Sequence, residues 1–347
     1  MASLRIAMAL PHLGVYGGIR RFLELGNLWA ERGHQVALLT PAAREGEGPW
    51  LPFSGRLATL DALSIEAWDV LLSPDPDLFA SCRAPGALRV FYAVLERAPG
   101  ESRAIRSADL VLANSRSMRR YLERKGVAAA DGAGGVNLGF FHPPIDESRT
   151  RRANSGGPLR ALVFGRLSRR RKGSWIAARA VERAARAAGV RVEIVLFDAP
   201  PPGAGPPALE GPLSVPHRWI LNPTQRELVD LYGGSDIFVS AERRAGWCNT
   251  AAEAMACGTT LVCTRSGTED FSQDGETAAV VRWPWTWLLA RAIAPLLVDP
   301  ARRAKLARRG LERIQEFSWE KTADRIERAI TDKLGGTRDG LQARRAV

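Results

Sequence analysis

The sequence has few residues that could form disulfide bonds or bind a structural metal ion. Its 347 residues include four cysteines and four histidines. No two cysteines form a C-x-x-C pair, and no histidine stands at metal-ligand spacing from them. This pattern argues against a disulfide scaffold and a zinc module. We therefore predict that Cys82, Cys248, Cys257 and Cys263 are reduced thiols, as is typical of a cytoplasmic protein.

Long hydrophobic runs are also missing. The best stretch, residues 284–298, is interrupted by Arg291 and falls short of the roughly 20 apolar residues that span a bilayer. Near the N-terminus, the apolar run at residues 6–10 is shorter than the about 7 to 15 residues of a signal-peptide core. We predict a cytoplasmic protein, with peripheral contact to the inner face of the membrane as an alternative.

Acidic residues are in deficit, which gives a net charge of +12, from 49 basic and 37 acidic residues. The excess lies in residues 151–347, which hold 32 basic and 21 acidic residues. We find neither a recognition helix nor aromatic side chains placed for base stacking, so we predict no nucleic-acid partner. A small phosphorylated ligand or an anionic membrane surface accounts for the excess equally well.

Short apolar runs alternate with helical patterns along the whole chain. A strand at residues 4–10, a helix after Gly18 and a strand at residues 35–40 form a first βαβ unit. Such alternation predicts α/β architecture with parallel sheets. The polar segment 146–157 predicts a domain boundary. We expect domains at 1–150 and 151–317, a closing helix at 318–334 and a flexible tail at 335–347.

Four segments contain glycines, basic residues or helix starts that could form a ligand-binding or catalytic site. Residues 11–21 contain Gly17 and Gly18 just before a helix, where the backbone can approach a ligand closely. Residues 163–173 contain the basic run from Arg166 to Lys172. Residues 245–262 place a loop before a helix start at Asn249, where free amides suit a phosphate. Residues 318–330 form an amphipathic helix.

Together these segments resemble, in order, the motifs of the family 4 glycosyltransferases, which have the GT-B fold. The resemblance implies two Rossmann-like parallel-sheet domains facing a cleft, with the C-terminal helix crossing back to the first domain. It also implies a retaining glycosyltransferase that moves a sugar from a nucleotide-sugar to an acceptor hydroxyl. The donor, a UDP-, GDP-, ADP- or dTDP-sugar, would bind the second domain. The acceptor, a cell-envelope glycan or natural product, would bind the first.

The resemblance also assigns roles to residues. Arg166 and Lys172 match the family's basic pair and would neutralise the leaving diphosphate, whereas Arg169, Arg170 and Arg171 have no counterpart and are interpreted as a solvated charge run. The amides of Asn249, Thr250 and Ala251 would bind phosphate, and Glu253 would bind the ribose hydroxyls. Gly17 and Gly18 would lie close to the bound ligand.

Two positions depart from the family pattern. Ala245 stands where the family has the first glutamate of its E-x7-E motif, so that carboxylate is either absent or supplied by Glu242. The family's histidine after the strand at residues 88–94 is also missing. Glu96 is the polar residue there with suitable chemistry, and we name it as a catalytic candidate. We interpret His34, His142 and His217 as structural or surface residues.

No cofactor or metal ion is expected besides the nucleotide-sugar substrate. The sequence Asp75-Pro76-Asp77 is a D-x-D match, but it lies in the first domain, away from the predicted diphosphate site. Fixed positive charge would take the role of a cation. Two alternatives remain open at this point: a nucleotide-sugar epimerase on the same fold, and a non-catalytic partner subunit that has lost the carboxylate at position 245.

Overall fold

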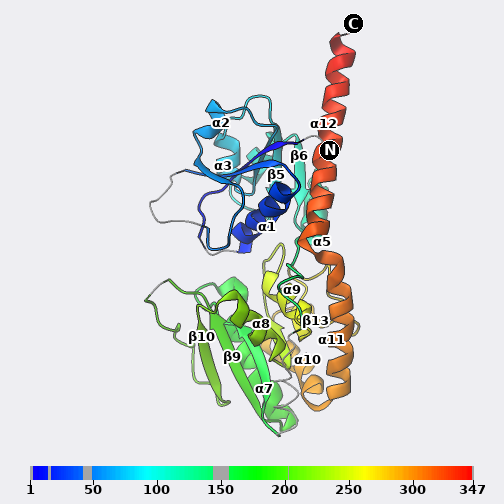
Figure 1. The fold of residues 1–347 in the computed structure, drawn as a ribbon. Helices are drawn as coiled ribbons and strands as arrows, with labels where there is room; N and C mark the ends of the chain where they lie inside the picture. Colours follow the sequence, from blue (N-terminus) through cyan, green and yellow to red (C-terminus); the bar gives the residue numbers. More distant parts are fainter. Residues whose placement is uncertain (1–2, 15–16, 42–48, 144–155, 202, 346–347) are drawn as a thin grey trace. The chain divides into compact units, whose positions relative to one another are not determined.

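The computed structural model describes residues 3–14, 17–41, 49–143, 156–201 and 203–345 (Figure 1). The chain forms two compact units. Unit 1 comprises Met1–Gly135 and Trp319–Val347, and unit 2 comprises Val136–Ser318. The predicted domain boundary at 150/151 lies outside the described residues. The units divide instead at Gly135, and the backbone N–H of Val136 donates to the carbonyl of Phe317 at 2.9 Å, within unit 2.

Unit 1 is built on a parallel sheet with strand order β3-β2-β1-β4-β5-β6-β7. Its strands are β1 (Arg5–Ala9), β2 (Gln35–Thr40), β3 (Arg56–Thr59), β4 (Val70–Ser73), β5 (Leu88–Ala93), β6 (Leu110–Ala113) and β7 (Ala130–Asp131). Its helices are α1 (Gly17–Glu31), α2 (Ala62–Ile65), α3 (Pro76–Ser81), α4 (Glu101–Arg106), α5 (Arg116–Glu123) and α12 (Trp319–Arg345). The central strands β1 and β4 are apolar except for Arg5 at the start of β1 and Ser73 at the end of β4, because both faces of a parallel sheet are covered.

Unit 2 is built on a second parallel sheet with strand order β10-β9-β8-β11-β12-β13. Its strands are β8 (Leu159–Phe164), β9 (Val192–Asp198), β10 (His217–Leu221), β11 (Ile237–Ser240), β12 (Thr260–Thr264) and β13 (Ala279–Val281). Its helices are α7 (Ser174–Ala188), α8 (Gln225–Gly233), α9 (Asn249–Ala256), α10 (Thr286–Val298) and α11 (Pro300–Ile314), with short 3-10 turns η1 (Arg170–Lys172) and η2 (Gln315–Phe317).

In both sheets the chain starts in the middle, proceeds to one edge and then returns to fill the other side. In unit 2 the strand order reverses between β8 and β11, which pair directly through Val163 and Val239. This is the doubly wound Rossmann order, in which ligands bind at the carboxyl ends of the strands next to the reversal. The predicted fold class, two Rossmann-like parallel sheets, is confirmed.

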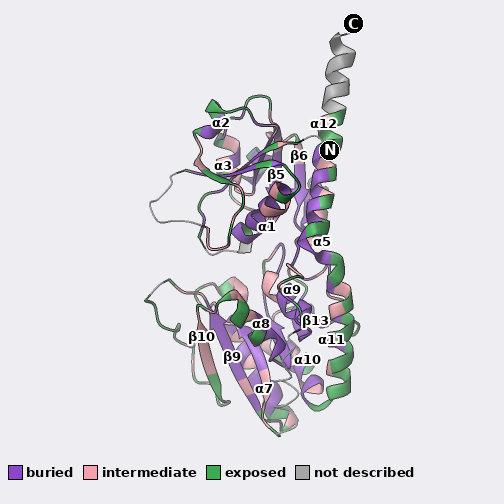
Figure 2. Cartoon of the chain, viewed as in Figure 1, coloured by how far each residue is buried: buried purple, intermediate pink, exposed green. Residues whose placement is uncertain are grey.

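The core of each unit lies between its sheet and its helices. Figure 2 shows buried residues along β9 and α7, and exposed residues along much of α11. In unit 1, helix α12 contributes Trp319, Ile326 and Ile330 to the core, the three packing positions expected for this helix. The helix continues to Arg345, past the expected end at residue 334 and into the segment expected to be a flexible tail.

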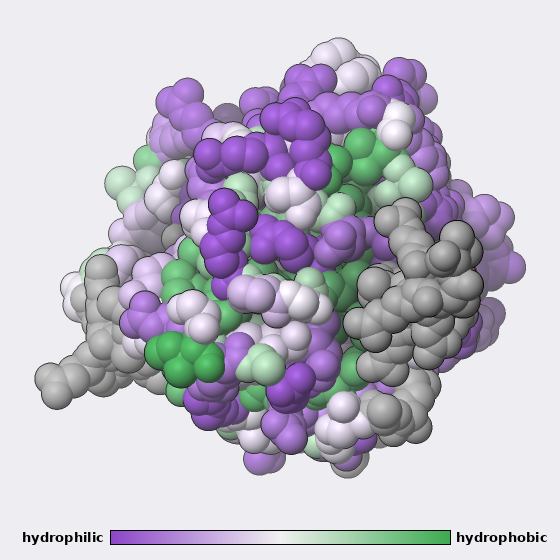
Figure 3. Space-filling model, turned by 90° about the horizontal axis from the view of Figure 1, so that it is seen from above, coloured by the Kyte–Doolittle hydropathy of each residue, from purple (hydrophilic) through white to green (hydrophobic). Residues whose placement is uncertain are grey.

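No helix in the described part of the chain is long and apolar enough to cross a membrane. The face shown in Figure 3 is largely hydrophilic, and hydrophobic residues occupy small areas of it separated by hydrophilic ones. All four cysteines are buried and free, in agreement with the prediction that they are thiols.

Candidate functional site

The loops that follow β8 and β11 hold most of the predicted donor-site residues. The two strands are neighbours, so their carboxyl ends bring the loop before α7 next to the loop before α9. Lys172 lies in the first loop and Glu242 in the second. The reversal of strand order thus places a cation and a carboxylate together, although 70 residues separate them in the sequence.

Gly173 makes this approach sterically feasible. Its φ is +64°, a left-handed conformation that L side chains rarely adopt. A Cβ atom there would overlap the main-chain oxygen of Ala241. The Lys-Gly pair of the predicted motif therefore has a structural reason: glycine lets the first loop rest against the second, which puts Lys172 beside Glu242.

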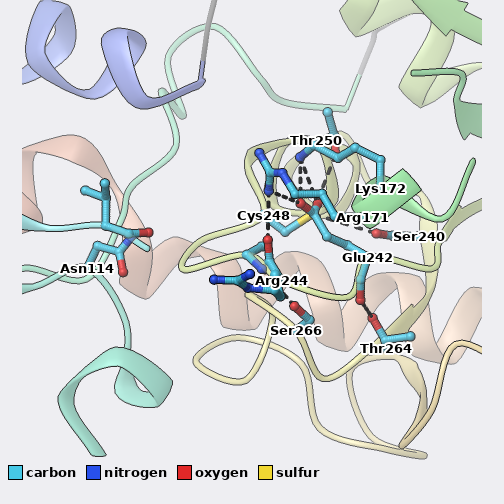
Figure 4. Close-up of polar contacts among 12 residues, drawn as sticks. Asn114, Arg171, Lys172, Ser240, Glu242, Arg244, Cys248, Thr250, Thr264 and Ser266 are labelled. Atoms are coloured by element: carbon cyan, nitrogen blue, oxygen red, sulfur yellow. Dashed lines mark hydrogen bonds and ion pairs between the residues drawn. The ribbon is translucent and has the colours of Figure 1, made fainter. Parts of the chain in front are cut away.

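Two cations converge on the buried carboxylate of Glu242 (Figure 4). Lys172 Nζ lies 2.7 Å from Oε1 and 3.0 Å from Oε2, and Arg171 donates to Oε1 at 3.1 Å. The Glu242 side chain is 2% exposed. Arg171 also donates to the carbonyl of Arg244 at 2.7 Å. The interpretation of Arg171 as part of a solvated charge run is therefore wrong, because the turn η1 directs it toward Glu242.

Helix α9 begins beside this ion-pair cluster, which we define as Arg171, Lys172 and Glu242. Cys248 is the N-cap, and its thiol donates to Glu242 Oε2 at 3.5 Å. Burial, with a further contribution from Glu242, raises the pKa of the Cys248 thiol to about 11. The thiol is therefore protonated at neutral pH and is a poor nucleophile.

The predicted phosphate-binding amides form the first turn of α9. Asn249 and Thr250 are half-buried, and Ala251 is buried. The Thr250 hydroxyl lies 3.6 Å from Cys248 Sγ, which ties the helix start to the cluster. The first turn of a helix has amides without partners in the helix and a partial positive charge, so it can bind an anion.

Arg166 lies on the other side of the same loop and is already paired. Its Nε lies 2.6 Å from Asp198 Oδ1, and it donates to the carbonyl of Ala199 at 2.8 Å. Asp198 ends β9 and is 4% exposed. A cavity of about 240 Å³ lies here, at the start of α7. Its lining includes Arg166, Arg169, Arg170, Ser174, Glu210 and Arg243.

This cavity carries polar groups that sequence reasoning did not assign to the site. Ser174 is the first residue of α7, and its buried Oγ has no hydrogen-bond partner. Arg169 and Arg170, which were set aside as solvated, line the cavity too. The signal that could have found Ser174 is its position, because it directly follows Gly173 at a helix start.

Glu253 lies in the middle of α9 and is 6% exposed. Its Oε2 accepts a hydrogen bond from the hydroxyl of Tyr232 at 2.9 Å. The Tyr232 ring is fully buried and packs edge-on against Phe197 and Phe238. The carboxylate is therefore held at one end by a rigid aromatic cluster.

Ala245, at the position of the absent family glutamate, is tightly packed. Its N–H donates to Ser266 Oγ at 2.9 Å. A Cβ on Gly267 would lie 2.6 Å from that of Ala245. Glu242, three residues earlier, is the carboxylate that the structure places beside Lys172.

The remaining predicted residues belong to unit 1. Gly17 begins α1, and a Cβ on Gly18 would meet no atom within 4 Å. Glu96, in the loop after β5, accepts from Ser117 Oγ at 3.1 Å. His34 is a structural residue, as expected: its Nδ1 accepts from the N–H of Leu4 at 3.0 Å.

The D-x-D match in unit 1 has structural partners. Asp75 caps α3 by accepting from the N–H of Leu78 at 2.9 Å, and Asp77 pairs with Arg103 at 2.8 Å. Within the described ranges there is no group of three or more His, Cys, Asp or Glu side chains that could hold a metal ion.

The chain thus has two doubly wound parallel sheets, with the ion-pair cluster and a helix start at the strand reversal of the second. Residues 158–299 match the family model described as glycosyl transferases group 1. This match covers the loops of unit 2 that hold Lys172, Glu242 and the start of α9. The resemblance to GT-B glycosyltransferases predicted from the sequence is confirmed.

The curated proteins and solved structures that the chain resembles include glycosyltransferases. The chain is 28% identical over 250 residues to the D-inositol 3-phosphate glycosyltransferase of Saccharomonospora viridis, covering 66% of this chain and 57% of that one. It is 26% identical over 243 residues to the enzyme of the same name from Rhodococcus erythropolis, covering 65% and 54%. The chain thus spans a little more than half the length of these curated relatives.

Among solved structures, sucrose-phosphate synthase from Thermosynechococcus elongatus superposes with a TM-score of 0.75 at 18% identity, covering 95% of this chain and 99% of that one. HepE of Anabaena in complex with UDP and glucose gives a TM-score of 0.73 at 15% identity, covering 95% and 100%. At these identities the likeness shows the fold.

Proposed function

We propose that this protein is a glycosyltransferase that moves a sugar from a nucleotide-sugar to an acceptor hydroxyl, with retention of the anomeric configuration. The observation that carries the proposal is the ion-pair cluster at the start of α9. It lies at the strand reversal of unit 2 and inside the segment that matches the glycosyl transferases group 1 model.

The donor diphosphate would bind between Lys172 and the first turn of α9. The Lys172 ammonium has three N–H donors, so it can keep its bond to Glu242 and still donate to a phosphate oxygen. The amides of Asn249 and Thr250 would add two further donors. Because negative charge develops on the phosphate as the sugar departs, donors fixed in advance stabilise the transition state more than the ground state.

Glu242 acts in this proposal as a positioning residue. A lysine side chain has four flexible carbons, and ordering it costs entropy. The buried carboxylate holds the ammonium in one place before the substrate arrives. Arg166, held by Asp198 beside the small cavity, would supply a second cation to the diphosphate. Glu253 would accept from the ribose hydroxyls.

Retention of configuration is proposed because the sequence motifs resemble those of the family 4 glycosyltransferases, a retaining family. The raised pKa of Cys248 argues against a covalent thiol intermediate. Without a nucleophile from the enzyme, the acceptor would attack from the side that the diphosphate leaves, and a phosphate oxygen would take its proton. Unit 1 would hold the acceptor, with Gly17, Gly18 and Glu96 as candidate contacts.

The nucleotide base of the donor and the identity of the acceptor must be determined by experiment. The solved complex of HepE contains UDP and glucose, so a UDP-sugar is the first donor to test. The curated relatives are named for an inositol phosphate acceptor, and a cell-envelope glycan or natural product is the acceptor class we propose here. We also propose a cytoplasmic, metal-independent enzyme that needs no resident cofactor.

Product analysis with UDP-, GDP-, ADP- and dTDP-sugars tests the proposal. Lys172→Ala should lower turnover by roughly 10²- to 10³-fold, the loss typical of removing one transition-state donor. Lys125→Ala is the matched control, since Lys125 in unit 1 also lies 2.7 Å from a buried glutamate, Glu101. The control should keep its activity.

Three results would contradict the proposal. A free or epimerised sugar formed without an acceptor would indicate an epimerase. Nucleotide binding without turnover for every donor would indicate a non-catalytic subunit. Equal activity of Lys172→Ala and the parent would show that the ion-pair cluster is not part of the donor site.

A further inference from the structure

Three tryptophans stand exposed within five residues of unit 2. Trp283, Trp285 and Trp287 are 49%, 50% and 47% exposed. They are half of the six large hydrophobic residues that are exposed in the described part of the chain, and the other three are scattered. Tryptophan is normally well buried, so three exposed rings in one segment form a surface that needs a partner.

The rings form a ladder, which we define as Trp283, Trp285 and Trp287. Trp283 and Trp285 are stacked, with ring centroids 6.3 Å apart and planes 21° apart. Trp285 and Trp287 are 5.8 Å apart and tilted by 32°. The guanidinium of Arg282 lies over the Trp283 ring at 5.3 Å. Each ring therefore directs a face toward a neighbouring ring of the ladder, and Arg282 lies over the ring at its N-terminal end.

The ladder is fixed to a rigid base. The N–H of Trp285 donates to the carbonyl of Trp283 at 2.8 Å, and the N–H of Leu289 donates to the carbonyl of Trp285 at 3.1 Å. Trp285 is the N-cap of α10, and Leu289 and Ile293 of that helix are fully buried. The exposed rings are therefore presented by an ordered helix start.

Along residues 282–298, which carry the ladder, the charged side chains have one sign. From residue 282 to residue 298 the charged residues are Arg282 and Arg291, and both are exposed. Apart from these arginines and the indole N–H groups, Thr286 has the one polar side chain in that stretch. The segment thus combines large amphipathic rings with positive charge and lacks carboxylate and amide side chains.

We propose that the tryptophan ladder docks unit 2 onto an anionic lipid surface. Indole edges with an apolar body and a polar N–H suit the headgroup region of a bilayer, and the arginines suit its negative charge. A sugar platform is less well matched, since sugar hydroxyls need carboxylate or amide partners and residues 282–298 contain neither side chain. The inference goes beyond the proposed function and does not depend on it, because lipid binding needs no donor.

Sedimentation with vesicles tests the inference. The full chain should bind vesicles of phosphatidylcholine with phosphatidylglycerol more tightly than vesicles of phosphatidylcholine alone. The variant Trp283→Gln/Trp285→Gln/Trp287→Gln should bind roughly tenfold more weakly or worse, because the apolar area that enters the interface is lost. Leu57→Gln/Ile65→Gln, which removes two exposed hydrophobic residues of unit 1, is the matched control and should bind like the parent.

A second variant keeps the test valid if the triple variant does not fold. Arg282→Gln/Arg291→Gln leaves the rings in place and should weaken binding to anionic vesicles by about fivefold for each charge removed. Failure of the parent to bind vesicles, or equal binding by the parent and the folded triple variant, would overturn the inference. Loss of binding to a polysaccharide or of self-association in the triple variant, with no vesicle binding by the parent, would assign the ladder to those partners instead.

Discussion

At the scale of single residues, the site depends on one glycine. Gly173 combines a φ of +64° with a close approach to the main chain of Ala241, and this approach brings Lys172 to Glu242. Sequence reasoning identified Lys172 and Arg166 as the cations of the motif. It named Glu242 as a substitute for the family's glutamate, but it did not pair Glu242 with Lys172 or Asp198 with Arg166, because those pairs exist only once β8 has β9 and β11 as neighbours.

Replacing this glycine separates backbone strain from steric overlap. Gly173→Ala should lower the free energy of unfolding by about 3 kcal/mol or more, because it adds an overlap to the left-handed strain. Gly189→Ala is the control: its φ is +63°, but a Cβ there meets nothing within 4 Å. It should cost about 1 kcal/mol. Urea unfolding measures both, and equal costs would mean that the Ala241 contact is unimportant.

At the scale of elements, the buried strands could be predicted from the sequence, whereas strands at the edges of the sheets could not. The bounds of β2 agree with the strand predicted at residues 35–40, since buried parallel strands appear in the sequence as continuous apolar runs. The strands β3 and β10 lie at sheet edges, and their residues are partly exposed, so they lack an apolar signal. The glycines near residue 335 were expected to end α12, but propensity alone does not end a helix.

Helix α12 is tied to its unit by a charged cluster with a clear pH dependence. Arg32 and His34 contact the Glu327 carboxylate at 2.7 Å and 3.1 Å. Burial acts to raise the pKa of the Glu327 carboxyl, but hydrogen bonds from Arg32 and His34 outweigh it and hold the pKa below its ordinary value.

A lowered pKa in the folded state gives stability that is complete above the ordinary glutamate pKa of about 4.3 and is lost as the pH falls through the folded value. The parent should therefore lose free energy of unfolding below about pH 4. Glu327→Gln should be less stable at pH 7, by roughly 2 kcal/mol, and should lose less on acidification. Thermal unfolding as a function of pH checks this, and parallel curves for the two proteins would contradict it.

At the scale of the whole molecule, the positive charge is concentrated in the second half of the sequence. Of the net +12, most lies in the half of the chain that contains the proposed donor-site loops. Cations already fixed at a site can stabilise a diphosphate without a divalent ion. The sequence predicted the class of ligand from charge and motif, but base, sugar and acceptor depend on loop shapes that residue types do not encode.

Transfer activity should therefore persist in excess EDTA. The physical reason is that Lys172, Arg166 and the first turn of α9 supply the positive charge that a bridging metal would supply. Initial rates measured with and without EDTA check this. Complete loss of activity in EDTA, with recovery on addition of magnesium or manganese, would mean that the diphosphate binds elsewhere.

The most direct test of the donor site is calorimetric titration of the protein with UDP, GDP, ADP and dTDP. One of these nucleotides should bind the parent in EDTA. Glu253→Gln should weaken that binding by about 1.5 to 3 kcal/mol, because the ribose hydroxyls lose a charged acceptor. Tyr232→Phe, which removes the hydroxyl that donates to Glu253 at 2.9 Å but keeps the carboxylate, should bind within about threefold of the parent, since the charged acceptor remains. Absence of binding by all four nucleotides, or equal affinity of Glu253→Gln and the parent, would contradict the account.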